Sequence, residues 1–200
     1  MKRREFDIFG ILVGLVIGCI LGFFLSTRID IQMPDNSNDE DVFAQAGYIY
    51  LLQIDKTTSA EVAKNTVIDI KGKNLFAVAV TEGNNYYVYG GIADSEAGLD
   101  ELKNKFLEKG YTTFIKKEYL LDKPNFFVGD QEKFDFYTEC VNNLIHSLKG
   151  EELEISEQTK ANPINLELFS AILTINTVQN NTLLCEVRLS IYEMIIESLV

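Results

Sequence analysis

Hydrophobic residues near the start of the chain form a run of 18 positions without a charge, from Ile8 to Leu25. As a helix this run would be about 27 Å long, close to the thickness of the hydrocarbon core of a bilayer. Lys and Arg fill positions 2–4, and acidic residues follow from Asp30 onward. Because positive flanks stay in the cytoplasm, the pattern predicts a transmembrane helix over 8–25. A cleaved signal peptide is the alternative, although its apolar region would be shorter.

This orientation predicts a cytoplasmic tail over 1–7 and places everything after the helix outside the cytoplasm, in a single-pass protein of the cell membrane. Glycine recurs at every fourth position of the helix, which would let a second helix approach closely. The four glycines are Gly10, Gly14, Gly18 and Gly22. Glycine is also common in membrane helices in general, which is the alternative explanation. We expect the helix to lie in lipid and to form a homodimer through these glycines.

A linker and four strand-like stretches follow. Polar and acidic residues dominate 26–46, which we interpret as a linker. Apolar, aromatic and β-branched residues then predict strands over 47–54, 75–83, 86–92 and 111–120. The polar sequence EGNN between the second and third stretches predicts a hairpin.

Two helical stretches separate these strands. The first, over 56–66, has a weak helical pattern, and the second, over 95–110, has one apolar stripe and ends at a glycine. The order strand, helix, strand, strand, helix, strand predicts an α+β fold over 47–123. Its sheet would be four-stranded and antiparallel, with both helices on one face and the other face open.

Short motifs in this region resemble those of the SPOR-domain family. YLLQ at 50–53 resembles the opening of a SPOR domain, and YYVYGG at 86–91, followed by GY at 110–111 and FIK at 114–116, resembles its second repeat. The resemblance implies an envelope protein of bacteria that acts in cell division or sporulation. It also implies that the domain binds peptidoglycan glycan strands stripped of their stem peptides.

Strand alternation predicts which side chains the open face presents. If Tyr50 and Leu52 face the helices, then Gln53, Tyr87 and Tyr89 lie on the open face. Tyrosine rings can stack on the apolar faces of sugars, and an amide can bond sugar hydroxyls. These three residues are therefore the candidate glycan-binding site, with Gln53 chosen mainly from the family resemblance. Exposed tyrosine pairs that only stiffen the sheet are the alternative.

The last part of the chain has a different charge. Residues 44–123 carry 10 Lys and 11 acidic residues, whereas residues 124–200 carry 4 Lys or Arg against 12 acidic residues, a net charge of −8. Helical spacing of apolar residues over 125–150, 164–179 and 181–200 predicts an acidic helical region, although the middle stretch also permits a strand. We expect such helices to pack on themselves or on the sheet domain, or to recruit an envelope protein. A non-catalytic, membrane-tethered adaptor is therefore the alternative function.

The composition excludes several kinds of chemistry. A net charge of −12 argues against a nucleic-acid partner, and three cysteines are too few for a disulfide framework. His146 is the only histidine, without a catalytic pattern around it, and no residues have metal-ligand or phosphate-loop spacing. We therefore expect no enzymatic activity, no metal and no cofactor.

Overall fold

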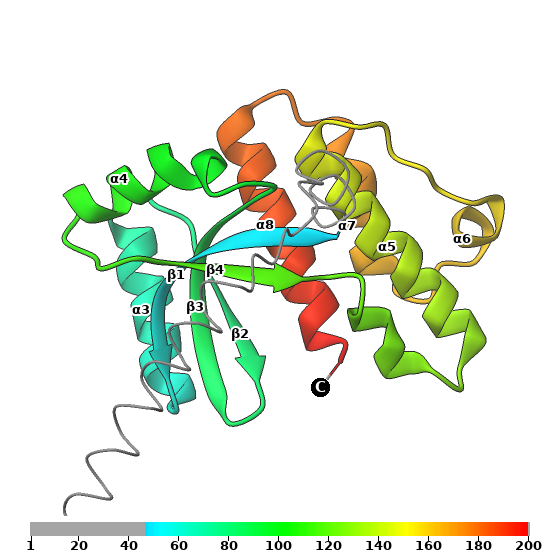
Figure 1. Ribbon diagram of the computed structural model, residues 1–200, viewed down its shortest axis with the longest axis horizontal. Helices are drawn as coiled ribbons and strands as arrows, with labels where there is room; N and C mark the ends of the chain where they lie inside the picture. Colours follow the sequence, from blue (N-terminus) through cyan, green and yellow to red (C-terminus); the bar gives the residue numbers. More distant parts are fainter. Residues whose placement is uncertain (1–46, 200) are drawn as a thin grey trace, which may run out of the picture. The chain divides into compact units, whose positions relative to one another are not determined.

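The computed structural model describes residues 47–199 (Figure 1). The predicted cytoplasmic tail, the transmembrane helix with its four glycines, and the linker lie outside these residues. Within 47–199, no helix has the length and apolar character needed to cross a membrane.

Four antiparallel strands form one sheet in the order β2-β3-β1-β4. The strands are β1 (Tyr48–Thr57), β2 (Val78–Glu82), β3 (Asn85–Ala93) and β4 (Phe114–Tyr119). A tight turn at Gly83, whose φ is +59°, joins β2 to β3, as the predicted hairpin requires. The α+β class and the four-stranded antiparallel sheet are confirmed.

One face of the sheet packs against α3 (Ala60–Gly72), the short helix η1 (Ala97–Leu99) and α4 (Asp100–Glu108). We call it the α3 face. Its buried core consists of Leu52, Ile54, Ala63, Ile70, Ala77, Val88, Ala93, Leu99 and Phe106. The two helices therefore lie where the alternation of β1 predicts them. The first helix starts later than predicted, because the Ser59 hydroxyl caps it by accepting from the Val62 amide. It also ends later than predicted, at Gly72.

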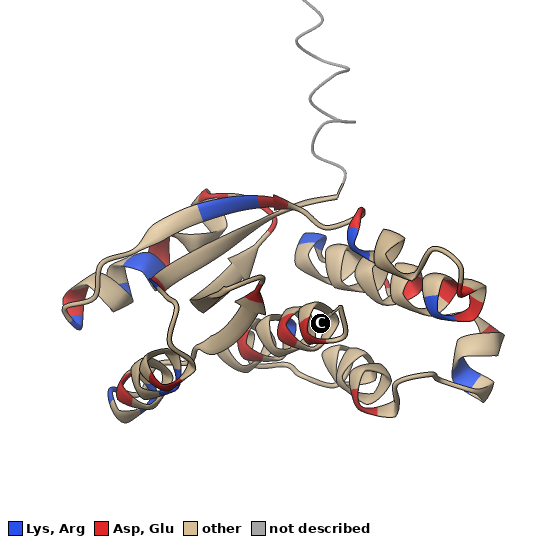
Figure 2. Cartoon of the chain, turned by 90° about the horizontal axis from the view of Figure 1, so that it is seen from below, with Lys and Arg blue, Asp and Glu red and all other residues tan. Residues whose placement is uncertain are grey.

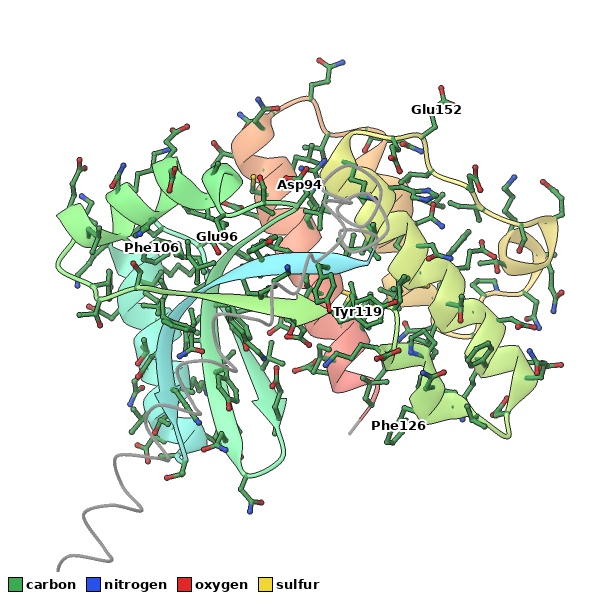
Figure 3. All side chains as sticks on the ribbon, in the orientation of Figure 1. Asp94, Glu96, Phe106, Tyr119, Phe126 and Glu152 are labelled. Atoms are coloured by element: carbon green, nitrogen blue, oxygen red, sulfur yellow. The ribbon has the colours of Figure 1, made fainter. Side chains whose placement is uncertain are left out.

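Gly90 and Gly91 allow α4 to pack closely on β3. An added Cβ at Gly90 would overlap the ring of Phe106, and one at Gly91 would overlap Leu102. Phe106 is fully buried, and Figure 3 shows it between α4 and the sheet. The glycine pair thus has a packing role in this fold.

The opposite face, which we call the α8 face, is also covered. The covering elements are the short helix η2 (Lys123–Phe127), α5 (Gln131–Lys149), α7 (Leu166–Ile175) and α8 (Asn181–Glu197). Buried members of this core include Ile49, Leu51, Val80, Tyr89, Ile92, Leu144, Leu168, Leu189, Ile191, Tyr192 and Ile195. The prediction of an open second face is therefore wrong, because apolar side chains on this face require a cover that α8 supplies.

The described residues, 47–199, belong to one compact unit. The predicted boundary between 123 and 124 passes through the core of the α8 face, which contains residues from both sides of it. The three predicted helical stretches appear as α5, α7 and α8, and the polar segment between the first two also holds the short helix α6 (Glu157–Ala161). The acidic helices are thus part of the same folded unit as the sheet.

We expect Gly90→Ala to lower the free energy of unfolding by about 1–3 kcal/mol, because the new methyl group would overpack the site against Phe106. Gly72→Ala is the control, since nothing lies within 4 Å of a Cβ at that position. Urea unfolding of a fragment spanning residues 44–200 measures both. Equal stability of the two variants would contradict the close approach of α4.

Candidate functional site

The three predicted site residues lie together on the α8 face. Gln53 and Tyr89 are direct partners across β1 and β3, and the rings of Tyr87 and Tyr89 stack with centroids 6.0 Å apart. Tyr89, however, has no exposed surface, because the ring of Tyr192 on α8 packs edge-on against it at 5.8 Å. Gln53 and Tyr87 remain half-buried. The predicted exposure is therefore wrong for Tyr89.

A polar network fixes α8 to the sheet. Lys116 on β4 lies 3.0 Å from carboxylate oxygens of both Glu82 and Glu118, and its ammonium also donates to the Tyr89 hydroxyl. From α8, the Tyr192 hydroxyl donates to Glu118 at 3.0 Å. We call these residues, together with Lys123, which pairs with Glu118 from η2, the junction network.

Partial burial makes this network electrostatically strong. Burial by itself would raise the pKa of Glu118, but the ammonium groups of Lys123 and Lys116 hold that pKa below its usual value. Burial likewise opposes the charge on Lys116, yet its hydrogen bond to Tyr89 and the carboxylate of Glu118 raise its pKa. The ion pairs of Glu118 therefore stay charged at neutral pH and present a carboxylate to the Tyr192 hydroxyl of α8.

The helices leave one end of the α8 face uncovered. Phe114 begins β4 opposite Gln53, and 63% of its surface is exposed. Lys56 lies opposite Tyr87 near the end of β1, and its side chain is exposed. We call these four residues the open end of the sheet. An exposed aromatic ring, an amide, a phenol and an ammonium group meet there, and this combination can stack on a sugar ring and bond its polar groups.

Sequence reasoning missed Phe114 and Lys56 as site residues. Phe114 could have been found, because alternation along the FIKKEY strand places it on the same face as Lys116 and Glu118. Lys56 could not, since simple alternation from Gln53 would place it on the opposite face.

A second concave surface lies on the C-terminal helices. A groove of about 870 Å³ runs between α5, α7 and the loop before α6. Its carboxylates belong to Asp135, Glu139 and Glu154, against the single ammonium of Lys160. His146 also lines it, and the Nδ1 atom of this histidine is buried without a hydrogen-bond partner in the described part of the chain. Acidic residues are spread over these helices (Figure 2), and α8 carries Glu186, Glu193 and Glu197.

Other predicted features carry little chemistry. Cys140 and Cys185 are both free thiols, and burial raises the pKa of Cys140, which makes it a poor nucleophile. Over residues 47–199, no group of His, Cys, Asp or Glu side chains is arranged to hold a metal ion.

Comparison with known proteins gives a single weak likeness. No protein-family model and no curated protein matches the chain. Among solved structures, it is similar to the solution structure of the peptidoglycan binding domain of the B. subtilis cell wall lytic enzyme CwlC, with 18% sequence identity and a TM-score of 0.33. The match covers 36% of this chain and 90% of that domain. A likeness of this size assigns neither fold nor function to the chain.

Glu193 lies on α8, beside the edge strand β2. Burial first, and the neighbouring Glu197 second, raise the pKa of Glu193 to about 7, although a hydrogen bond from the Ala79 backbone opposes the shift. The usual value is 4.5, so between these two pH values the folded chain holds a proton that the unfolded chain has lost. The contribution of this residue to stability therefore decreases as the pH rises through that interval.

We expect Glu193→Gln to be more stable than the wild type at pH 8, because it removes the buried carboxylate. After allowance for solvent screening, the gain is on the order of 1 kcal/mol, and it should nearly vanish at pH 5. Urea midpoints of the fragment of residues 44–200 at the two pH values measure the difference. Glu186→Gln on the same helix is the control, and a pH-independent effect of Glu193→Gln would contradict the raised pKa.

Proposed function

We propose that this chain is a single-pass protein of the cell membrane that binds peptidoglycan glycan strands outside the cytoplasm, during cell division or sporulation. The membrane anchor would be residues 8–25, which fit the length and flanking charges of a spanning helix. The resemblance of residues 50–53 and 86–91 to SPOR domains supports the glycan ligand. The proposal assigns no catalytic step to the chain.

The open end of the sheet is the observation that carries this proposal. Phe114 offers an exposed ring on a rigid strand, and Gln53 lies directly beside it across the β1–β4 ladder. Tyr87 adds a phenol at the next strand, although its ring already stacks on Tyr89 and lies beneath Lys116 at 5.1 Å. Phe114 is therefore the stacking surface for a sugar, and Gln53 is the group that bonds its hydroxyls.

Since α8 covers the rest of the face, Tyr89 supports Tyr87 from behind and does not touch the ligand. A glycan strand would therefore contact only the end of the sheet and would not cross it from edge to edge. The contact area is small, so we expect modest affinity that repeated sites along the cell wall would strengthen.

Phe114→Ala should weaken binding to peptide-stripped sacculi about tenfold, because it removes the stacking surface, whereas Phe126→Ala should leave binding unchanged. The two rings are 63% and 64% exposed, and Phe126 lies on η2 (Figure 3), so the pair is matched in chemistry and accessibility. Sedimentation of the full-length protein in mild detergent with stripped and intact sacculi measures the affinities. Absence of wild-type binding, or an equal loss in both variants, would refute the proposal.

The acidic groove favours a second candidate function, that of an adaptor for a positively charged segment of an envelope protein. Glu154 and Asp135 line the groove and are exposed, and both carboxylates could pair with Lys or Arg of a partner. Deletion of residues 124–200 would not test this idea, because it would remove the cover of the α8 face.

The adaptor function predicts that the double variant Asp135→Lys and Glu154→Lys loses a partner that cross-links to the wild-type protein in the envelope. Phe114→Ala should retain that partner, because it lies outside the groove. The reverse pattern would favour the open end of the sheet as the partner site.

A further inference from the structure

An irregularity in β1 determines where the side chain of Lys56 lies. Gln53 pairs with Tyr89, but Asp55 pairs with the very next residue of β3, Val88, so that Ile54 is an extra residue in the ladder. Such a bulge reverses the alternation of the residues after it. Lys56 therefore pairs with Tyr87 and lies on the α8 face.

The same bulge separates the side chain of Lys56 from that of its sequence neighbour Asp55. Asp55 shares the α3 face with its partner Val88, and its carboxylate accepts hydrogen bonds from the Thr66 hydroxyl on α3 and from the Lys56 backbone amide. The carboxylate of Asp55 is therefore used on the opposite face. Among the salt bridges of residues 47–199, none includes Lys56.

The other cation of this surface is already paired. Lys116 binds the carboxylates of Glu82 and Glu118 in the junction network, so its charge is neutralised. Lys56 instead projects over the Tyr87 ring, with its ammonium 5.2 Å from the ring centroid, and its side chain is exposed. The open end of the sheet thus combines one unpaired positive charge with the stacking and amide groups.

The chain as a whole is acidic, with a net charge of −12. This net charge disfavours a negatively charged polymer, and a local cation favours the binding of an anionic ligand at one place. Lysine provides a flexible point charge that can follow a carboxylate on a saccharide.

Resting on the proposed glycan function, we infer that Lys56 binds a carboxylate of the saccharide and makes the open end of the sheet selective for carboxylate-bearing sugars. A muramyl residue exposes a free lactyl carboxylate when its stem peptide is removed, whereas a residue that still carries the peptide has an amide at that position. The ammonium of Lys56 would pair with this carboxylate while Phe114 holds the sugar ring. Lys56 is thus a specificity-determining residue that discriminates stripped glycan from intact glycan.

The test uses stripped sacculi before and after their carboxylates are converted to neutral amides with a carbodiimide and methylamine. The full-length protein in mild detergent should bind the amidated wall about tenfold more weakly than the stripped wall, because the charge-assisted contact is lost. Lys56→Gln should bind the stripped wall as weakly as the wild type binds the amidated wall, and amidation should not weaken it further. Lys56→Arg should keep most of the preference, because it keeps the charge.

Lys64→Gln is the charge-matched control, since Lys64 is an exposed residue of α3, on the other side of the sheet. Equal binding of the wild type to stripped and amidated walls would overturn the inference and leave the proposed function standing. Undiminished binding by Lys56→Gln would overturn the role of Lys56. Absence of wild-type binding to both walls would overturn the proposed function and this inference together.

Discussion

Apolar side chains on both faces of one sheet are the constraint on which the rest of the structure depends. Leu52 and Val88 point to the α3 face, while Ile49 and Leu51 point to the α8 face, and all four are fully buried. A sheet with two apolar faces needs a layer of helices on each side. The C-terminal helices are therefore required by the composition of the strands, and they do not form an appendage to a finished domain.

The elements themselves could be predicted from local patterns. Alternating and β-branched stretches marked all four strands, and the glycines at 110 and 150, both with positive φ, correctly ended their helices. The cover on the α8 face was missed, although the near-continuous apolar run of YIYLLQI in β1 is typical of a strand buried on both sides. Alternation therefore predicts an exposed Tyr89, whereas its side chain is buried beneath α8.

The site was harder to predict, because it depends on features that sequence alternation does not reveal. Bulges at Gly90 and Ile54 change the pairing of β3 and β1, and the second one moves Lys56 to the face that carries Gln53. The position of α8 determines which part of that face stays uncovered. This position depends on contacts between residues more than a hundred positions apart, such as Tyr89 and Tyr192. Residue types suitable for sugars could be recognised from the sequence, but their accessibility could not.

The junction network explains why the cover on the sheet has a single position. Apolar packing alone is tolerant of sliding and rotation, whereas the Tyr192 hydroxyl reaches the buried carboxylate of Glu118 only when α8 is correctly placed. Moving α8 away would break this hydrogen bond, whereas the ion pairs of Glu118 with Lys116 and Lys123 lie within the sheet and η2. Glu118, which accepts this hydrogen bond from α8, also neutralises Lys116 together with Glu82. Lys56 is therefore the unpaired cation of the open end, and it supplies the charge that a ligand meets on this part of the sheet.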